Sequence, residues 1–141
     1  ACSSAIPLFS SKAPAPTHEA SLGLIAYVGN DGNIYTTNRD GKQSNAITLD
    51  ANLNPAAAQS KRIYQYPTWS PDGQRLAFVR FLLNESGPEA SLISVLSNGK
   101  NPVNNFTSQS FQPFYLSWQG CSVLTYSDVI QDIVDVQAII E

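Results

Sequence analysis

The chain has 141 residues, a formal net charge of −3 and a charged fraction of 13%. This length suits about one domain with a hydrophobic core of its own. The mild acidity and the lack of a basic patch argue against nucleic acid as a partner. No apolar run approaches the ~20 residues that a membrane-spanning helix requires.

The first 21 residues contain several prolines and show no hydrophobic periodicity, so we expect residues 1–21 to form a flexible tether. Residues 1–4, Ala-Cys-Ser-Ser, resemble the start of a bacterial lipoprotein, where small residues precede a cysteine that becomes lipidated. This resemblance makes Cys2 a candidate lipidation site. An ordinary cysteine in the tether and a disulfide to Cys121 are the alternatives.

Short runs of β-forming residues then alternate with Asp-Gly turn signals, which is typical of an antiparallel meander. We expect the first three strands at residues 22–29, 34–38 and 46–49. A polar connector, rich in alanine and asparagine, is expected over residues 50–61.

A hairpin at residues 66–80 is the clearest unit of the chain. Its turn, Ser-Pro-Asp-Gly at residues 70–73, favours type I geometry because proline fixes φ at the second position and glycine closes the turn. Residues 76–79 are all apolar, without alternation, which predicts a strand that is buried on both faces.

The second half of the chain continues this pattern. Residues 82–90 are expected to form an exposed hairpin loop. Strands are expected at residues 91–96, 103–107, 111–118 and 121–127. The tail, residues 129–141, is rich in β-branched residues, which favours a strand, although its apolar residues also fit the spacing of an amphipathic helix.

These strands form an internal repeat. Trp69 and Trp118 are 49 positions apart, and Ala26 and Ala77, each inside a similar apolar run, are 51 positions apart. A period near 50 residues built from four short strands is typical of a β-propeller blade. We therefore expect an all-β fold, a partial β-propeller of about three four-stranded antiparallel blades with incomplete end blades. The expected blade units are residues 22–50, 62–108 and 111–141.

The pattern resembles the repeat of TolB-type β-propellers. In that repeat a Trp-Ser-Pro-Asp-Gly hairpin, as at residues 69–73, leads into a strand like Leu-Ala-Phe-Val at residues 76–79. Residues 67–107 carry one complete copy, and the flanking copies are partial, with Trp-Gln-Gly replacing the hairpin motif at residues 118–120. The resemblance implies the propeller fold.

Propeller blades cover one another face to face, so an open stack of three blades leaves two apolar faces in water. We therefore expect a protein partner or a second copy of the chain to cover these faces. The chain is then either a homo-oligomer or a fragment of a longer propeller, and a compact sandwich of the sheets is the less favoured alternative.

The residue types that carry catalysis are sparse. The one histidine, His18, lies in the expected tether, which argues against a Ser-His-Asp triad and against histidine-based metal sites. No glycine-rich phosphate loop follows a strand. We therefore expect no enzyme activity and no cofactor or metal.

Aromatic residues gather at the start of the repeat unit. In most propellers such residues pack between blades, while a minority face the channel mouth and contact a peptide or a sugar. The candidate ligand or partner contacts are Tyr66, Trp69, Tyr115 and Trp118.

The TolB resemblance implies a non-catalytic protein-interaction module of the bacterial cell envelope, periplasmic or extracellular, which reaches the membrane only through a lipid on Cys2. Two alternatives stay open at this point. One is the accessory propeller of a serine peptidase-like hydrolase, and the other is a purely structural homo-oligomer.

Overall fold

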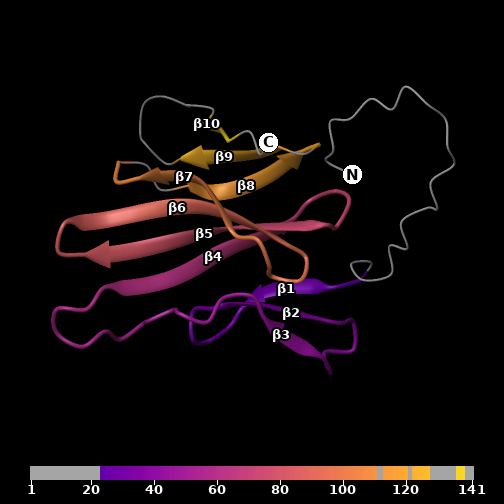
Figure 1. The fold of residues 1–141 in the computed structure, drawn as a ribbon, viewed down its shortest axis with the longest axis horizontal. Helices are drawn as coiled ribbons and strands as arrows, with labels where there is room; N and C mark the ends of the chain where they lie inside the picture. Colours follow the sequence, from indigo (N-terminus) through magenta and orange to yellow (C-terminus); the bar gives the residue numbers. More distant parts are fainter. Residues whose placement is uncertain (1–22, 111–112, 121, 128–135, 139–141) are drawn as a thin grey trace, which may run out of the picture.

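A computed structural model of the protein describes residues 23–110, 113–120, 122–127 and 136–138. These residues form ten strands (Figure 1). The strands are β1 (Ile25–Val28), β2 (Ile34–Thr37), β3 (Ser44–Ala46), β4 (Lys61–Trp69), β5 (Arg75–Asn84), β6 (Gly87–Leu96), β7 (Val103–Ser108), β8 (Pro113–Gln119), β9 (Ser122–Ser127) and β10 (Val136–Ala138). No helix occurs among the described residues, so the predicted all-β fold is confirmed for this part of the chain.

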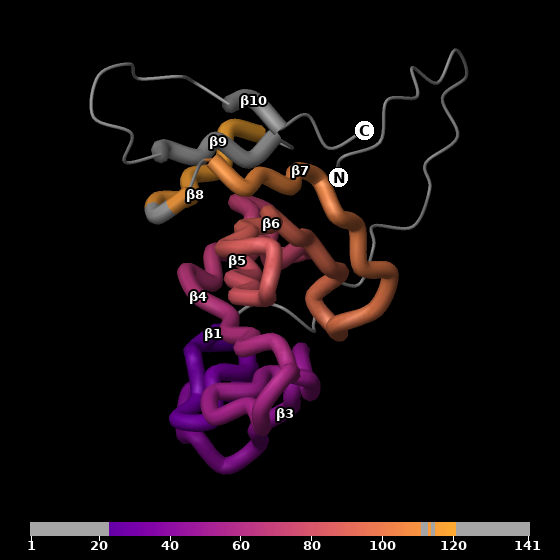
Figure 2. The backbone as a smooth tube through the Cα atoms, turned by 90° about the vertical axis from the view of Figure 1, so that its left-hand side faces the viewer, coloured from indigo at the N-terminus to yellow at the C-terminus, as the bar shows by residue number. Residues whose placement is uncertain are grey.

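The strands form three antiparallel sheets that stack as layers. The first sheet has the order β1-β2-β3, the middle sheet β4-β5-β6-β7 and the third sheet β8-β9-β10. Figure 2 shows the first sheet below the middle sheet and β8 above it. The layers meet mainly at β4, which contacts β1 and β2 on one side and β8 on the other.

The middle sheet is buried on both faces because β5 carries apolar side chains at four consecutive positions. Leu76 and Phe78 form a cluster with Ile34 of the first sheet. Ala77 and Val79 belong to a second cluster, which includes apolar side chains of β8. All four β5 side chains are at most 1% exposed, which confirms the prediction for residues 76–79.

Glycines in the left-handed backbone region close four of the connections. Gly32, Gly41, Gly73 and Gly99 have φ values of 83°, 70°, 67° and 79°, which glycine adopts without strain. Each donates its N–H to the carbonyl three residues earlier, at 2.8–3.0 Å. The Asp or Asn before each glycine accepts the N–H two residues further on, at 2.9–3.1 Å. The turn chemistry expected from the sequence is therefore confirmed, and these side chains have structural roles.

The third strand lies earlier than predicted, at Ser44–Ala46 instead of residues 46–49. Thr48 explains the difference, because its Oγ1 accepts the N–H of Ile34 at 2.9 Å in place of a backbone carbonyl. The Ile34 carbonyl in turn accepts the N–H groups of both Ile47 and Thr48, at 2.8 and 3.3 Å. This side-chain bond replaces the regular ladder and ends the strand.

The predicted exposed loop at residues 82–90 is wrong. Asn84 pairs with Gly87, so β5 and β6 continue until only two residues remain in the turn between them. The longer β5 also gives β4 a pairing partner from Lys61 onward, which is why β4 begins there. Asn84 Oδ1 accepts the N–H of Ser86 at 2.8 Å, and Gly87 takes a φ of 108°. Pro88 is tolerated because the pairing of β6 with β7 begins only at Ala90, so no neighbour there requires a donor.

Several predictions concern residues that the structure does not describe or describes only in part. Val136–Ala138 pairs with β9, which confirms a strand for these three residues of the tail. The rest of the tail, at residues 128–135 and 139–141, lies outside the described residues, as do Cys121 and residues 1–22 with Cys2 and His18.

Burial between the layers predicts a large cost for truncating the core. Leu92 is fully buried in β6, in the cluster that packs against β8. We expect Leu92→Ala to lower the free energy of unfolding by about 2–5 kcal/mol, measured by urea denaturation. Leu83→Ala, whose side chain is 54% exposed, is the matched control and is expected to change it by about 0.5 kcal/mol at most. Equal losses in the two variants would contradict the layered core.

Candidate functional site

The four aromatic candidates lie on β4 and β8, the first strands of the middle and third sheets. Trp69 packs against the cluster between the first and middle sheets. Trp118 packs against the cluster between the middle and third sheets. Both tryptophans therefore support the stack, each facing the sheet that precedes its own in the sequence.

The two indoles differ in their hydrogen bonds. Trp118 Nε1 donates to the backbone carbonyl of Thr68 at 3.0 Å, which joins the third sheet to the middle one. Trp69 Nε1 is also buried, but it has no hydrogen-bond partner in the described structure. An unpaired buried donor costs about 1–3 kcal/mol, so the two equivalent side chains are not equally well satisfied.

Tyr66 has the most unusual backbone of β4. Its φ of 58° places a bulky residue in the left-handed region, at a cost of about 1–3 kcal/mol. The residue lies where the β4–β5 register shifts between Gln65 and Thr68. Its ring is edge-on to Phe81, 6.3 Å between centroids, and the residue is 40% exposed. Bulges of this kind redirect side chains and are common beside functional sites.

Tyr115 occupies the matching place on β8, 49 positions after Tyr66. It is 57% exposed. Its neighbour Leu116 is buried against the middle sheet, so the alternation of side chains along a strand points Tyr115 away from that sheet. The register of β8 also shifts beside it, between Pro113 and Tyr115.

The structure therefore does not bring the four aromatic residues into one pocket. It places the two tryptophans between sheets and one exposed tyrosine on the first strand of each of two successive sheets. The sequence did not separate the two pairs, because which side chains are exposed depends on the register in which β4 and β8 pair with their neighbours.

Asp50 anchors β4 beside these aromatic residues. It accepts a hydrogen bond from Tyr64 Oη at 2.6 Å and forms an ion pair with Arg62. Burial of the phenol, together with its hydrogen bond to Asp50, raises the pKa of Tyr64 to about 12. Burial alone would raise the pKa of Asp50, but the hydrogen bond from Tyr64 and the charge of Arg62 outweigh burial and lower it.

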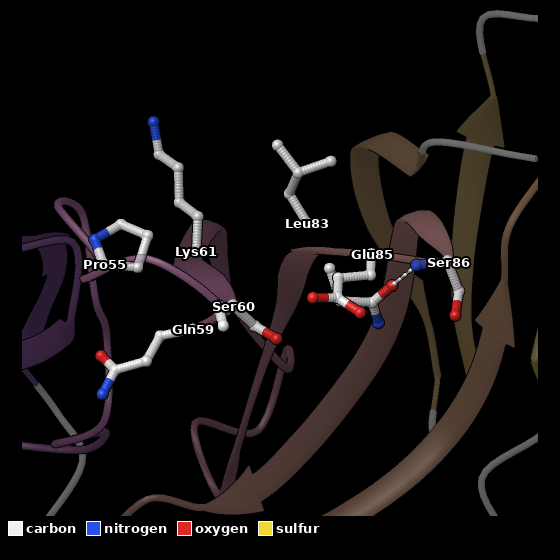
Figure 3. Close-up of a pocket in the computed structure, with 9 residues that line it drawn as sticks. Pro55, Gln59, Ser60, Lys61, Leu83, Glu85 and Ser86 are labelled. Carbon is white, nitrogen blue, oxygen red and sulfur yellow. Dashed lines mark hydrogen bonds between the residues drawn. The ribbon is translucent and has the colours of Figure 1, made fainter.

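A hollow of about 600 Å³ lies where the connector meets the β5–β6 turn, and sequence reasoning missed it because it depends on the extended β5 (Figure 3). Its lining residues are Pro55, Ala58, Gln59, Ser60, Lys61, Leu83, Asn84, Glu85 and Ser86. The lining has one carboxylate, one ammonium group and no histidine. Neither a carboxylate pair nor a Ser-His pair is available there, so the hollow offers polar contacts without a catalytic arrangement.

The described part of the chain shows neither a metal cluster nor a helix that could cross a membrane. No three of its His, Cys, Asp or Glu side chains are grouped so that they can hold a metal ion, and none of its segments is a helix able to cross a membrane. Comparisons of the chain with protein-family models, with curated proteins and with solved structures found no match. The geometry is therefore the basis for the function proposed below.

The raised pKa of Tyr64 predicts a loss of stability at high pH. An unfolded tyrosine has a pKa of about 10. Because the pKa of Tyr64 is higher in the folded chain, the neutral buried phenol adds to the free energy of unfolding fully below about pH 10. This contribution is lost as the pH rises toward 12. We expect Tyr64→Phe to flatten this alkaline decrease in the free energy of unfolding, measured by urea denaturation from pH 8 to pH 12. Tyr66→Phe leaves the Tyr64–Asp50 bond in place and should keep the parent's decrease. If the free energy of unfolding of Tyr64→Phe falls with pH as steeply as that of the parent, the alkaline loss of stability comes from another group.

Proposed function

We propose that the chain is a partial β-propeller of the TolB type, which acts as a non-catalytic protein-binding module of the bacterial cell envelope. The layered arrangement supports the propeller assignment, because the sheets pack face to face and meet at β1, β4 and β8. Propeller blades contact one another in the same face-to-face manner.

The strand order in the end sheets also supports incomplete blades. The repeat offset matches β1, β2 and β3 with β5, β6 and β7 of the middle sheet, in the same spatial order. The same comparison matches β8, β9 and β10 with β4, β5 and β6. The end sheets thus correspond to the later and earlier parts of one four-stranded unit.

The exposed tyrosines carry the binding proposal, and Tyr66 is the decisive one. A strained left-handed tyrosine on a bulged strand costs stability, and 40% of the residue remains in contact with solvent. Backbone strain of this kind clusters at functional sites, which include the sites that clamp a ligand. Tyrosine also suits a protein interface, because it combines a large apolar ring with a hydroxyl and loses little side-chain entropy.

The partner is a protein or a second copy of the chain. The outer face of the first sheet exposes Ile25 and Tyr27, at 51% and 38%, and is open in this structure. Tyr115 points from the third sheet away from the middle sheet, which extends the available contact area to the other end of the stack. A lipid on Cys2 would hold such a module at the membrane surface, in the periplasm or outside the cell.

Photo-crosslinking tests the proposal. A benzoylphenylalanine residue placed at position 66 or 115 keeps an aromatic ring at each site, and position 49 is the control because Leu49 is 81% exposed. With envelope extracts, or with the purified chain alone, we expect both tyrosine positions to give an adduct with the same protein and position 49 to give none. No adduct at either site, or identical labelling from position 49, would reject the proposed surface.

The affinity for that partner should depend on the ring at position 66. We expect Tyr66→Ala to weaken binding by about tenfold or more, because aromatic anchors contribute at least ~1.4 kcal/mol at well-packed contacts. Tyr66→Phe keeps the ring and should retain most of the affinity, and Leu49→Ala should match the parent. Binding that survives Tyr66→Ala unchanged would remove Tyr66 from the interface.

A further inference from the structure

A second hollow, of about 490 Å³, lies between the first sheet and the turn that joins β6 to β7. Its polar lining comes from Thr36 and Asn45 on the first sheet and from Ser97 and Asn98 on the turn, and Ile47 adds apolar surface. Small-molecule sites have volumes of about 300–1,000 Å³. None of the lining side chains carries a charge, so the hollow is suited to a neutral, polar ligand.

Thr36 gives the hollow a polar group that has no partner among the described residues. It lines the hollow from β2 and is only 2% exposed, yet its hydroxyl forms no hydrogen bond with any of these residues. A buried hydroxyl without a hydrogen bond is unfavourable. Asn45 lies directly opposite Thr36 in the β2–β3 ladder, so the two side chains project from the same face of the first sheet and form one polar wall.

The middle sheet shows how the chain satisfies the equivalent hydroxyl when it needs no ligand. The Asp-Gly and Asn-Gly turns that follow β2 and β6 are 58 positions apart, and this offset matches Thr36 with Ser94. Ser94 is fully buried, and its hydroxyl accepts a hydrogen bond from Asn105 Nδ2 at 3.0 Å. Ala46 stands at the place of Asn105, one residue before the Ile-Thr pair that matches Phe-Thr in β7. An alanine side chain has no donor, so the partner of the Thr36 hydroxyl comes from the hollow.

The turn on the other side of the hollow presents a second polar wall. Asn98 Oδ1 accepts the N–H of Lys100 at 2.9 Å, which leaves the Nδ2 group of Asn98 as a donor. A Cβ atom built on Gly99 would lie 3.3 Å from Cδ1 of Ile47, so the turn lies directly against this side chain. Contacts within the chain therefore hold both walls in place, and a site that is already formed loses little entropy when a ligand binds.

We propose that this hollow binds a neutral saccharide, at a site separate from the exposed tyrosines. The hydroxyl of Thr36 and the carboxamides of Asn45 and Asn98 bond to the hydroxyls of the sugar, and Ile47 contacts its C–H groups. Each sugar hydroxyl both donates and accepts, so one ring satisfies a threonine hydroxyl and two carboxamides, whereas a peptide group offers one fixed donor and one fixed acceptor. A phosphate or a carboxylate finds no charge-assisted hydrogen bond in this lining.

Titration with simple sugars tests the proposal. Glucose, galactose and N-acetylglucosamine are added in turn to the ¹⁵N-labelled chain, and we expect at least one of them to shift the amide signals of Thr36, Asn45 and Asn98 along a common saturation curve. Thr36→Val keeps the shape of the side chain and removes the hydroxyl, so it should weaken this binding by about tenfold, because a sugar hydroxyl loses its partner. Thr36→Ser keeps the hydroxyl and should retain most of the affinity.

Thr37→Val is the matched control. Thr37 is the next residue of β2, so its side chain projects from the opposite face of the first sheet, and its buried hydroxyl also has no partner among the described residues. This variant should bind the sugar as the parent does. Saturation by none of the three sugars, or equal affinities of Thr36→Val and the parent, would overturn the proposal. Binding of acetyl-trialanine amide without binding of a sugar would also overturn it and make the hollow a peptide site.

Discussion

The fold depends on the burial of one sheet between two others. Residues 76–79 of β5 are apolar and buried at consecutive positions, which is stable only when both faces of the strand are covered. Burial stabilises the fold by about 1.5–3 kcal/mol for each of Leu76, Phe78 and Val79, and by less for Ala77, so uncovering one face costs a large part of the stability of a small domain. The core of the middle sheet therefore requires the first and third sheets as covers. A partner can contact only the surface that remains exposed once these two sheets are in place.

The first strands combine features that restrict how a partner can bind. β4 and β8 each contain a proline, Pro67 and Pro113, and each ladder shifts register near an exposed tyrosine. Proline removes a donor and a bulge bends the edge, and both oppose the addition of a strand from another chain. The side chains of Tyr66 and Tyr115 remain available in these places. The proposed recognition would therefore use these rings and not backbone pairing.

The sequence predicted those parts of the fold that local chemistry determines. The glycine turns, the meander and the two-sided burial of β5 follow from residue type and position alone. The end of β3 did not, because it depends on Thr48 reaching Ile34 across 14 residues. The prediction of an exposed loop at residues 82–90 was wrong for the same reason. Only the pairing of Asn84 with Gly87 shows that the polar residues of this segment extend two strands. The left-handed backbone of Tyr66 likewise comes from the register of β4 on β5 and could not be predicted from the sequence.

The outer face of the first sheet also bears on the kind of partner proposed above. Tyr27 and Tyr35 stack there at 5.6 Å, and both hydroxyls are hydrogen-bonded to nearby side chains of the same sheet and its turn. This face therefore combines aromatic rings with hydrogen-bonded polar groups, unlike the apolar clusters between the layers. For the proposed partner, a surface of this mixed character suits a contact that forms and dissociates, because obligate interfaces are more hydrophobic and resemble a domain core.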